Sequence, residues 1–284
     1  MKPLLAGLLL WTSLPAEAAD KKNTQPGPAE DAHSVSTKVL PSDVLPSLPD
    51  WKITLPVDAK GKDSSAAAEV DKRNRKPREV IDDALTGFEM PPYFYARGGE
   101  VFFRAHCGGA TTKGSKYPRC ELRQRVGGGN GYWSMQDHQK LVTELRVTKT
   151  PVQKPEVCMV QIHGPDDEPM RLQYHARTGL HLIWNESHKK KFSNEVPYTL
   201  GQRLRVTTEV DKGRITCTVL NLDNQKQFTH TWTAVDKAGY FKLGCYTQSS
   251  IFLSQFKNGM KDEESDAYGE VAVSKIELTE TFRK

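Results

Sequence analysis

The stretch "YFKLGCYTQ", residues 240–248, alternates between two kinds of side chain. Apart from one glycine, every second position carries a polar or aromatic group, namely Tyr240, Lys242, Tyr246 and Gln248. The apolar residues Phe241, Leu243 and Cys245 lie between them. Successive side chains of a β-strand point to opposite faces, so the pattern predicts a strand with one face in the core. The other face carries two phenols, an ammonium group and an amide, which is unusual for a strand that is merely solvated.

Short alternating segments of the same kind fill the rest of the chain from about residue 46. They are separated by turn-forming stretches such as "VGGGNGY" at 126–132 and "GPDDEP" at 164–169. A helical pattern occurs only around 66–85, where "IDDAL" predicts a short helical turn. Many strands with few helices predict an all-β fold, an antiparallel sandwich or jelly roll. The concave face of such a sheet is a natural groove for a long ligand.

The first 45 residues differ in composition from the remainder. Lys2 is followed by a short apolar run and then by Ala16-Glu17-Ala18, which predicts a secretory signal peptide over 1–18. The run is well below the ~20 apolar residues of a membrane-spanning helix. Residues 19–45 have few large apolar side chains and are expected to be a disordered linker or pro-segment. We therefore expect a secreted protein, not bound to a membrane after cleavage, with one domain over 46–284.

Composition limits the possible partners. Of the 284 residues, 37% are hydrophobic and 26% charged, which is ordinary for a globular domain, and we expect a monomer. The net charge of +5 is compatible with an anionic partner. Export and the lack of a dense Lys/Arg stripe argue against nucleic acid. The five cysteines allow a pair, with Cys107 and Cys120 nearest in sequence, or buried free thiols, and both alternatives remain open.

Two further segments have the same kind of polar face. In "RCELR", the alternation places Arg119, Glu121 and Arg123 together, opposite an apolar face. In "VQIHG", it places Gln161 and His163 together. Taken singly, each segment is most simply read as an exposed polar face or an ion network. Three such strands carrying the groups of an anion site predict a shared groove.

The three segments also resemble the signature motifs of a known family. "RCELR", "QIH" and "YFKLGCYTQ" are similar to R-x-E-L-R, Q-[I/V]-H and Y-F-K-x-G-x-Y-x-Q of polysaccharide lyase family 7, the alginate lyases. The segments "DWKITLPVD" and "GGATTKGSKYPRCELR" add to the likeness, which spans almost the whole globular part. The resemblance implies a β-jelly roll, a concanavalin-like sandwich of two antiparallel sheets, whose concave face binds a polyuronate and cleaves it by β-elimination. Cys120 departs from the Ser or Thr more usual there, but points toward the core.

The chemistry of elimination accounts for the residue types independently. Removing the C5 proton of a 4-linked uronate creates a dianion, so cations and hydrogen-bond donors must stabilise its carboxylate. Arg123 and Gln161 suit this role. His163, with a pKa near neutrality, suits the base, and Tyr246 suits the acid that protonates the departing O4. A phenol is a poor base unless nearby cations lower its pKa.

The remaining polar residues are assigned to substrate binding and orientation. Glu121 is expected to orient Arg119 and Arg123, while Lys242, Gln248 and Tyr240 are expected to contact substrate, with packing as an alternative for Tyr240. In guluronate, H5 and O4 lie on opposite faces of the ring, so two residues divide the work, whereas in mannuronate Tyr246 alone exchanges both protons. The Ile162 form of the motif implies, by family analogy, guluronate-containing blocks. No metal or other cofactor is expected.

Three other functions remain as alternatives. A glycoside hydrolase needs two cooperating carboxylates, and these strand faces offer only Glu121, held by arginines. A non-catalytic carbohydrate-binding module would not require His163 and Tyr246 together. A lyase acting on another polyuronate, such as glucuronan, would need the same residues as an alginate lyase.

Overall fold

The larger of two antiparallel sheets carries the three polar strand faces. The computed structural model describes residues 38–61, 76–165, 167–185, 190–192 and 196–282. Within these residues the larger sheet has nine strands. Its order is β11 (Lys190–Phe192), β10 (Gly179–Trp184), β9 (Met170–His175), β8 (Glu156–His163), β15 (Ala238–Thr247), β5 (Arg119–Gln124), β1 (Trp51–Asp58) and β2 (Pro77–Ile81), and β6 (Trp133–Ser134) pairs with β15.

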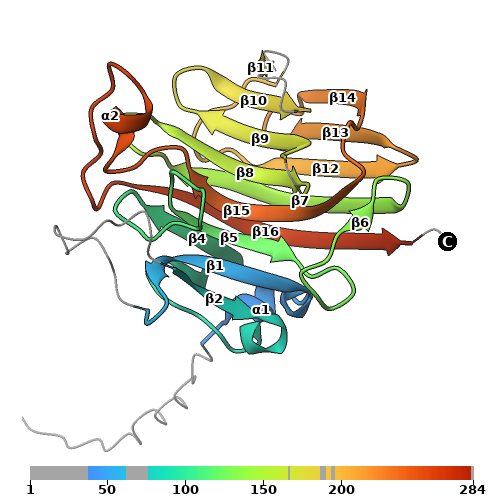
Figure 1. Ribbon diagram of the computed structural model, residues 1–284, viewed down its shortest axis with the longest axis horizontal. Helices are drawn as coiled ribbons and strands as arrows, with labels where there is room; N and C mark the ends of the chain where they lie inside the picture. The colour runs from blue at the N-terminus through green and yellow to red at the C-terminus, as the bar shows by residue number, and fades with distance from the viewer. Residues whose placement is uncertain (1–37, 62–75, 166, 186–189, 193–195, 283–284) are drawn as a thin grey trace, which may run out of the picture. The chain divides into compact units, whose positions relative to one another are not determined.

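The second sheet has seven strands in the described part of the chain. Its order is β14 (Gln227–Thr233), β13 (Arg214–Asn221), β12 (Leu204–Asp211), β7 (His138–Lys149), β16 (Tyr268–Thr281), β4 (Glu100–His106) and β3 (Phe94–Arg97). Strand β15, drawn in orange, runs through the middle of the molecule between β8 and β5 (Figure 1). The predicted all-β jelly roll of two antiparallel sheets is confirmed.

Alternation along the strands builds the core between the sheets. On β7, buried and half-buried residues alternate along almost the whole strand, as expected for a strand with one solvated face. On β15, Phe241, Leu243 and Cys245 join the core, but the residues between them are buried as well. The outer side chains of β15 are therefore largely shielded from solvent.

Gly244 interrupts the polar face of β15 for a steric reason. Its φ of +137° is one that residues with a side chain rarely adopt, and a Cβ there would lie 2.7 Å from the backbone oxygen of Cys120. The register between β15 and β8 also shifts between Leu243 and Tyr246. The glycine therefore allows β15 to approach β5 closely beside this irregularity.

Helical elements are few and short in the described residues. They are α1 (Pro41–Val44), α2 (Leu253–Phe256) and the 3-10 helices η1 (Leu48–Asp50) and η3 (Asp82–Leu85). The helical turn predicted at "IDDAL" is present as η3. No described helix is long and apolar enough to span a membrane.

The globular part begins earlier than the sequence indicates. Residues 38–45 were expected to belong to a linker, but the compact unit starts at Lys38, and Leu45 is fully buried in the main core. A few apolar residues were enough to anchor this segment, which composition alone did not reveal. The predicted signal peptide over 1–18 and the linker up to 37 lie outside the described residues.

The five cysteines are all buried free thiols. The pairing of Cys107 with Cys120, one of the two alternatives, is therefore not formed. Cys120 instead lies directly opposite Cys245 in the register of β5 and β15, with its side chain in the core.

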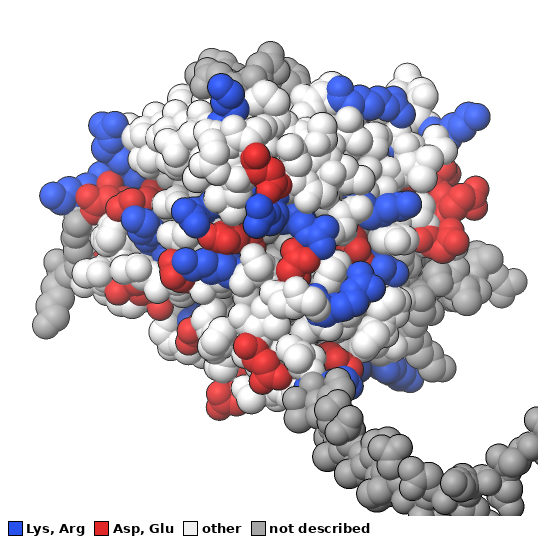
Figure 2. Space-filling view, turned by 180° about the vertical axis from the view of Figure 1, so that it is seen from behind, with Lys and Arg blue, Asp and Glu red and all other residues white. Residues whose placement is uncertain are grey.

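Charges of both signs are mixed on the face of the molecule seen in Figure 2. On the smaller sheet, Arg146 pairs with Glu100 at 2.6 Å and Arg205 with Glu144 at 2.7 Å. Such pairing leaves little net positive potential at these positions. It does not favour nucleic acid as a partner.

Candidate active site

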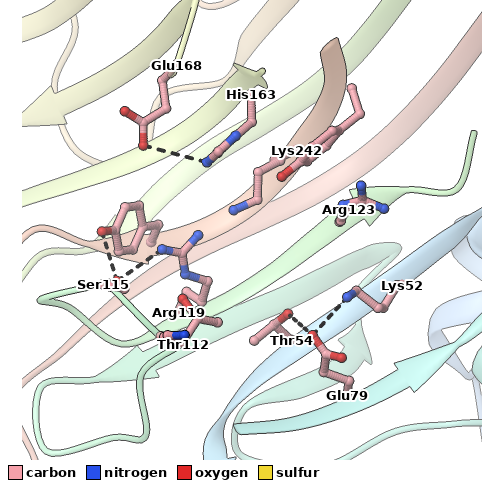
Figure 3. Close-up of a pocket in the computed structure, with 14 residues that line it drawn as sticks. Lys52, Thr54, Glu79, Thr112, Ser115, Arg119, Arg123, His163, Glu168 and Lys242 are labelled. Atoms are coloured by element: carbon pink, nitrogen blue, oxygen red, sulfur yellow. Dashed lines mark hydrogen bonds and ion pairs between the residues drawn. The ribbon is translucent and has the colours of Figure 1, made fainter. Parts of the chain in front are cut away.

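A cleft of about 400 Å³ opens on the outer face of the larger sheet (Figure 3). It lies over the strands β1, β2, β5, β8 and β15 and is bordered by two connecting segments. The residues that line it are Lys52, Thr54, Glu79, Thr112, Lys113, Gly114, Ser115, Arg119, Arg123, His163, Glu168, Tyr240, Lys242 and Tyr246. Six of the nine residues singled out from the sequence are among them.

Strand register brings these residues together. Between β15 and β8, Tyr240 lies opposite His163, and Lys242 lies opposite Gln161. Between β15 and β5, the opposed pairs are Lys242 with Arg123, Gly244 with Glu121, and Tyr246 with Arg119. Directly opposed residues of adjacent strands share a face and lie within contact distance. The shared groove predicted from three separate segments is therefore present.

Glu121 is the buried centre of the charge network. Its carboxylate lies 2.9 Å from Nη1 of Arg119 and 2.5 Å from Nζ of Lys242, and it accepts a hydrogen bond from Nε2 of Gln161. Burial raises the pKa of this carboxyl, but Lys242 and Arg119 outweigh burial and hold the pKa below its ordinary value. Glu121 is therefore ionised and pairs with Arg119, as expected. Its second cationic partner is Lys242, whereas Arg123, which was expected beside it, donates to Asn130.

Lys242 is a cation at neutral pH, but its pKa is lowered. Burial, followed by the nearby Arg119 guanidinium, lowers the pKa of Lys242 to about 8. Its ammonium group lines the cleft while one of its contacts goes to Glu121. An ammonium group has three donors, so the remaining ones are available to an anionic ligand.

His163 presents an unprotonated nitrogen at physiological pH. Its Nδ1 lies 2.6 Å from the carbonyl oxygen of Gly164, which only accepts, so Nδ1 carries the proton and Nε2 the lone pair. Burial and the charge of Lys242 lower the pKa of His163 below its ordinary value. Nε2 lies 3.9 Å from Oε1 of Glu168, and the ring stacks on Tyr240. These features suit a general base.

Tyr246 keeps its phenolic proton. Its Oη lies 3.1 Å from Oγ of Ser115, and the Arg119 guanidinium lies 3.9 Å from its ring centre. Burial raises the pKa of Tyr246 above its ordinary value, despite the opposing effects of Arg119 and Ser115. The condition under which a phenol becomes a good base, a pKa lowered by cations, is not met. The group is suited to donating a proton.

Arg123 is held in place by the "GGGNG" loop. Its guanidinium donates to the side-chain oxygen and to the backbone oxygen of Asn130, both at 2.9 Å, and to the oxygen of Gly131. It also lies 3.9 Å from the ring centre of Tyr240. These contacts fix the guanidinium plane at the cleft wall beside Tyr240.

Three of the expected site residues do not line the cleft. Glu121 and Gln161 lie beneath it, and each is about 1% exposed. Gln248 follows the end of β15, and its side-chain amide donates to the backbone oxygens of Tyr246 and Thr247. The alternation was extrapolated to Gln248 beyond the last residue of the strand, so its expected contact with substrate gains no support from its position.

Comparison with known proteins defines the family. The alginate lyase family model matches residues 47–280. The chain belongs to the alginate lyases of polysaccharide lyase family 7. The resemblance identified from the three motifs is thus confirmed, and the protein is an alginate-type polysaccharide lyase. The hydrolase and the non-catalytic module are no longer alternatives.

Solved structures of alginate lyases superpose on most of this chain. Alginate lyase AlgAT5 of polysaccharide lyase family 7 is 30% identical, with 86% of this chain and 100% of that one covered and a TM-score of 0.67. The alginate lyase from Corynebacterium sp. is 28% identical, with 85% and 98% covered and a TM-score of 0.66. A variant of alginate lyase A1-II' in complex with the substrate GGMG is 18% identical, with 84% and 95% covered and a TM-score of 0.63. The curated proteins gave no match.

Several residues that line the cleft of the lyase were not predicted from the sequence. Lys52 and Thr54 alternate along β1, and Lys52 pairs with Glu79 at 2.9 Å. Their alternation in "DWKITLPVD" could have placed both side chains on the same polar face. Ser115 and Glu168 lie in connecting segments, where no periodicity reveals which way a side chain points.

The buried ion network provides a test of stability. Replacing Glu121 with glutamine leaves Arg119 and Lys242 without their counter-charge, which is expected to lower the free energy of unfolding by about 3 kcal/mol. Glu209→Gln is the matched control, because Glu209 is 37% exposed and pairs with His138 and Lys140 on the other sheet. Its loss is expected to cost about 1 kcal/mol or less. Urea denaturation of both variants measures the difference, and equal losses would contradict the assigned role of Glu121.

Proposed function

We propose that this lyase cleaves guluronate-containing blocks of alginate by β-elimination, with His163 as base and Tyr246 as acid. The observation that carries the proposal is that a neutral imidazole and a protonated phenol line one cleft together with Arg119, Arg123 and Lys242. Elimination of a uronate needs a base for the C5 proton, an acid for O4 and cations for the carboxylate. The cleft offers all three.

The cations and donors have distinct tasks in this scheme. Arg123 and Lys242 receive the uronate carboxylate as its charge increases during proton removal. Gln161 acts through Glu121, to which its amide donates, and so helps to hold Lys242 and Arg119 at the cleft floor. Tyr240 lines the cleft, and its ring packs against the ring of His163 and the guanidinium of Arg123.

The protonation states favour guluronate over mannuronate. In guluronate, H5 and O4 lie on opposite faces, so a base and a separate acid are required. In mannuronate, both lie on one face, and Tyr246 would have to begin as a phenolate. The raised pKa of Tyr246 opposes that state. The two-residue route is therefore the more accessible one.

Product absorbance distinguishes the possible substrates. The lyase is incubated separately with polyguluronate, polymannuronate and glucuronan, and the absorbance of the unsaturated uronate product is followed. We expect the fastest increase with polyguluronate. An increase with glucuronan alone would overturn alginate as the substrate, and faster cleavage of polymannuronate would overturn the block preference.

The pH dependence of kcat/KM follows from the lowered pKa values of His163 and Lys242. His163 must be neutral to act as base, and its lowered pKa places the acid limb below the usual histidine value of about 6.5. Lys242 must be charged to bind a carboxylate, so KM is expected to rise as pH increases through about 8. Initial rates measured across this range at several substrate concentrations test both limbs. An acid limb well above 6.5 would contradict the assigned base.

We also propose that the protein is exported after cleavage near Ala18. The support is the apolar run and the small residues at 16–18. Amino-terminal sequencing of protein recovered outside the producing cell tests this, and a retained Met1 would contradict it.

A further inference from the structure

Ser115 lies beside the phenolic oxygen of Tyr246. This serine is in the segment before β5 and lines the cleft (Figure 3). Its Oγ lies 3.1 Å from Oη of Tyr246 and 3.1 Å from Nη2 of Arg119. The same oxygen lies 3.0 Å from the backbone oxygen of Tyr117 and 3.4 Å from its backbone nitrogen. A single hydroxyl therefore joins the phenol, the guanidinium and the backbone.

Counting protons and lone pairs limits how these groups bond. A serine hydroxyl has one proton and two lone pairs. The Arg119 guanidinium and the Tyr117 N–H only donate, so together they occupy both lone pairs. The hydroxyl proton is then shared between two acceptors, the Tyr117 carbonyl and Oη of Tyr246. When it turns toward Tyr246, the phenolic proton is free to point into the cleft.

We propose that Ser115 is a positioning residue that makes Tyr246 a stronger acid, an inference that rests on the proposed function. As the C4–O4 bond breaks, the phenolic O–H bond breaks too, the proton moves to O4, and a phenolate remains. Ser115 donates to that phenolate, and Arg119 supplies positive charge beside it. A hydrogen bond to an ionised group is stronger than one to a neutral group, so the bond strengthens during the reaction.

The proposed strengthening of the Ser115 hydrogen bond during the reaction predicts a specific change in the kinetic constants. An interaction that strengthens only in the transition state changes kcat, whereas one that binds substrate throughout changes KM. Ser115→Ala is expected to lower kcat about tenfold to a hundredfold, the usual effect of losing a hydrogen bond to a charged group, with KM changed by about twofold or less. Ser115→Thr keeps the hydroxyl and is expected to stay within about threefold of the wild type.

The experiment measures kcat and KM on polyguluronate for Ser115→Ala and Ser115→Thr, alone and combined with Tyr246→Phe. Phenylalanine has no proton to control, so Ser115→Ala is expected to have about twofold effect or less in that background. Thermal unfolding checks each variant, and Ser115→Cys replaces the alanine variant if that one does not fold, because a thiol is a weaker donor of similar size.

The outcomes distinguish the role of Ser115 from the proposed function. If Tyr246→Phe is inactive while Ser115→Ala matches the wild type, the role of Ser115 is overturned and the proposed function stands. An equal loss from Ser115→Ala in both backgrounds, a rise in KM alone, or failure of threonine to restore the rate would also overturn the role of Ser115. If Tyr246→Phe retains the wild-type kcat, the proposed function is overturned, and this inference with it.

Discussion

Tyr246→Phe is expected to lower kcat about a hundredfold to ten-thousandfold, the range typical of general acid catalysis, with little change in substrate affinity. The phenyl ring retains the position beside Arg119 and the packing against Tyr117, because only the hydroxyl is removed. Binding depends on the cations of the cleft, which the substitution leaves in place. The substitution is therefore expected to slow the chemical step and to leave substrate binding unchanged. Product absorbance gives kcat, and calorimetric titration with a short oligosaccharide gives the affinity.

A neighbouring tyrosine provides the control for that experiment. Tyr117 is buried to nearly the same extent as Tyr246, and the two ring centres lie 6.3 Å apart. Tyr117 is not among the described residues that line the cleft. Its change to phenylalanine is expected to alter kcat by about threefold or less, as for a side chain with no part in proton transfer. Similar losses in the two variants, or equal losses of binding and turnover in Tyr246→Phe, would count against Tyr246 as the acid.

His163→Ala is expected to lower kcat on polyguluronate by a similar factor, about a hundredfold to ten-thousandfold. The reason is that no second histidine lines the cleft within the described residues. Polymannuronate cleavage is expected to suffer no more than polyguluronate cleavage. The reason is that in guluronate the base must lie on the face of the sugar ring opposite Tyr246. Initial rates on the two separate polymers measure the ratio.

His175→Ala is the matched control for the base. His175 lies on β9 of the same sheet, is half-buried and also has a pKa lowered mainly by burial, but it does not line the cleft. We expect its replacement to change the rates on both polymers by about threefold or less. If His163→Ala slowed polymannuronate cleavage alone, the division of labour between His163 and Tyr246 would be wrong.

The strand faces of the site could be predicted from the sequence because their geometry is fixed by backbone period. Once Phe241 and Leu243 are assigned to the core, Tyr240 and Lys242 must share the other face. The same reasoning placed Arg119 with Glu121 and Gln161 with His163. It does not extend to Gln248, which lies beyond the end of the strand, where the period no longer holds.

Burial and loop contacts could not be predicted in this way. The outer face of β15 was expected to line a groove, yet its Lys242 and Tyr246 are more than 90% buried. This burial sets the direction of the pKa shift of Tyr246, and periodicity contains no information about it. The positions of Ser115 and Asn130 likewise depend on how turns fold back onto the sheet, which involves contacts distant in sequence.

A crystal structure of the Tyr246→Phe variant with a guluronate oligosaccharide tests the assignment of base and acid most directly. One uronate ring should lie with its C5 about 3 Å from Nε2 of His163, so that the base can reach the proton to be removed. Its O4 should face residue 246 from the opposite side, and its carboxylate should contact Arg123 or Lys242. A ring whose C5 is out of reach of His163, or whose C5 hydrogen and O4 both face residue 246, would contradict the two-sided elimination.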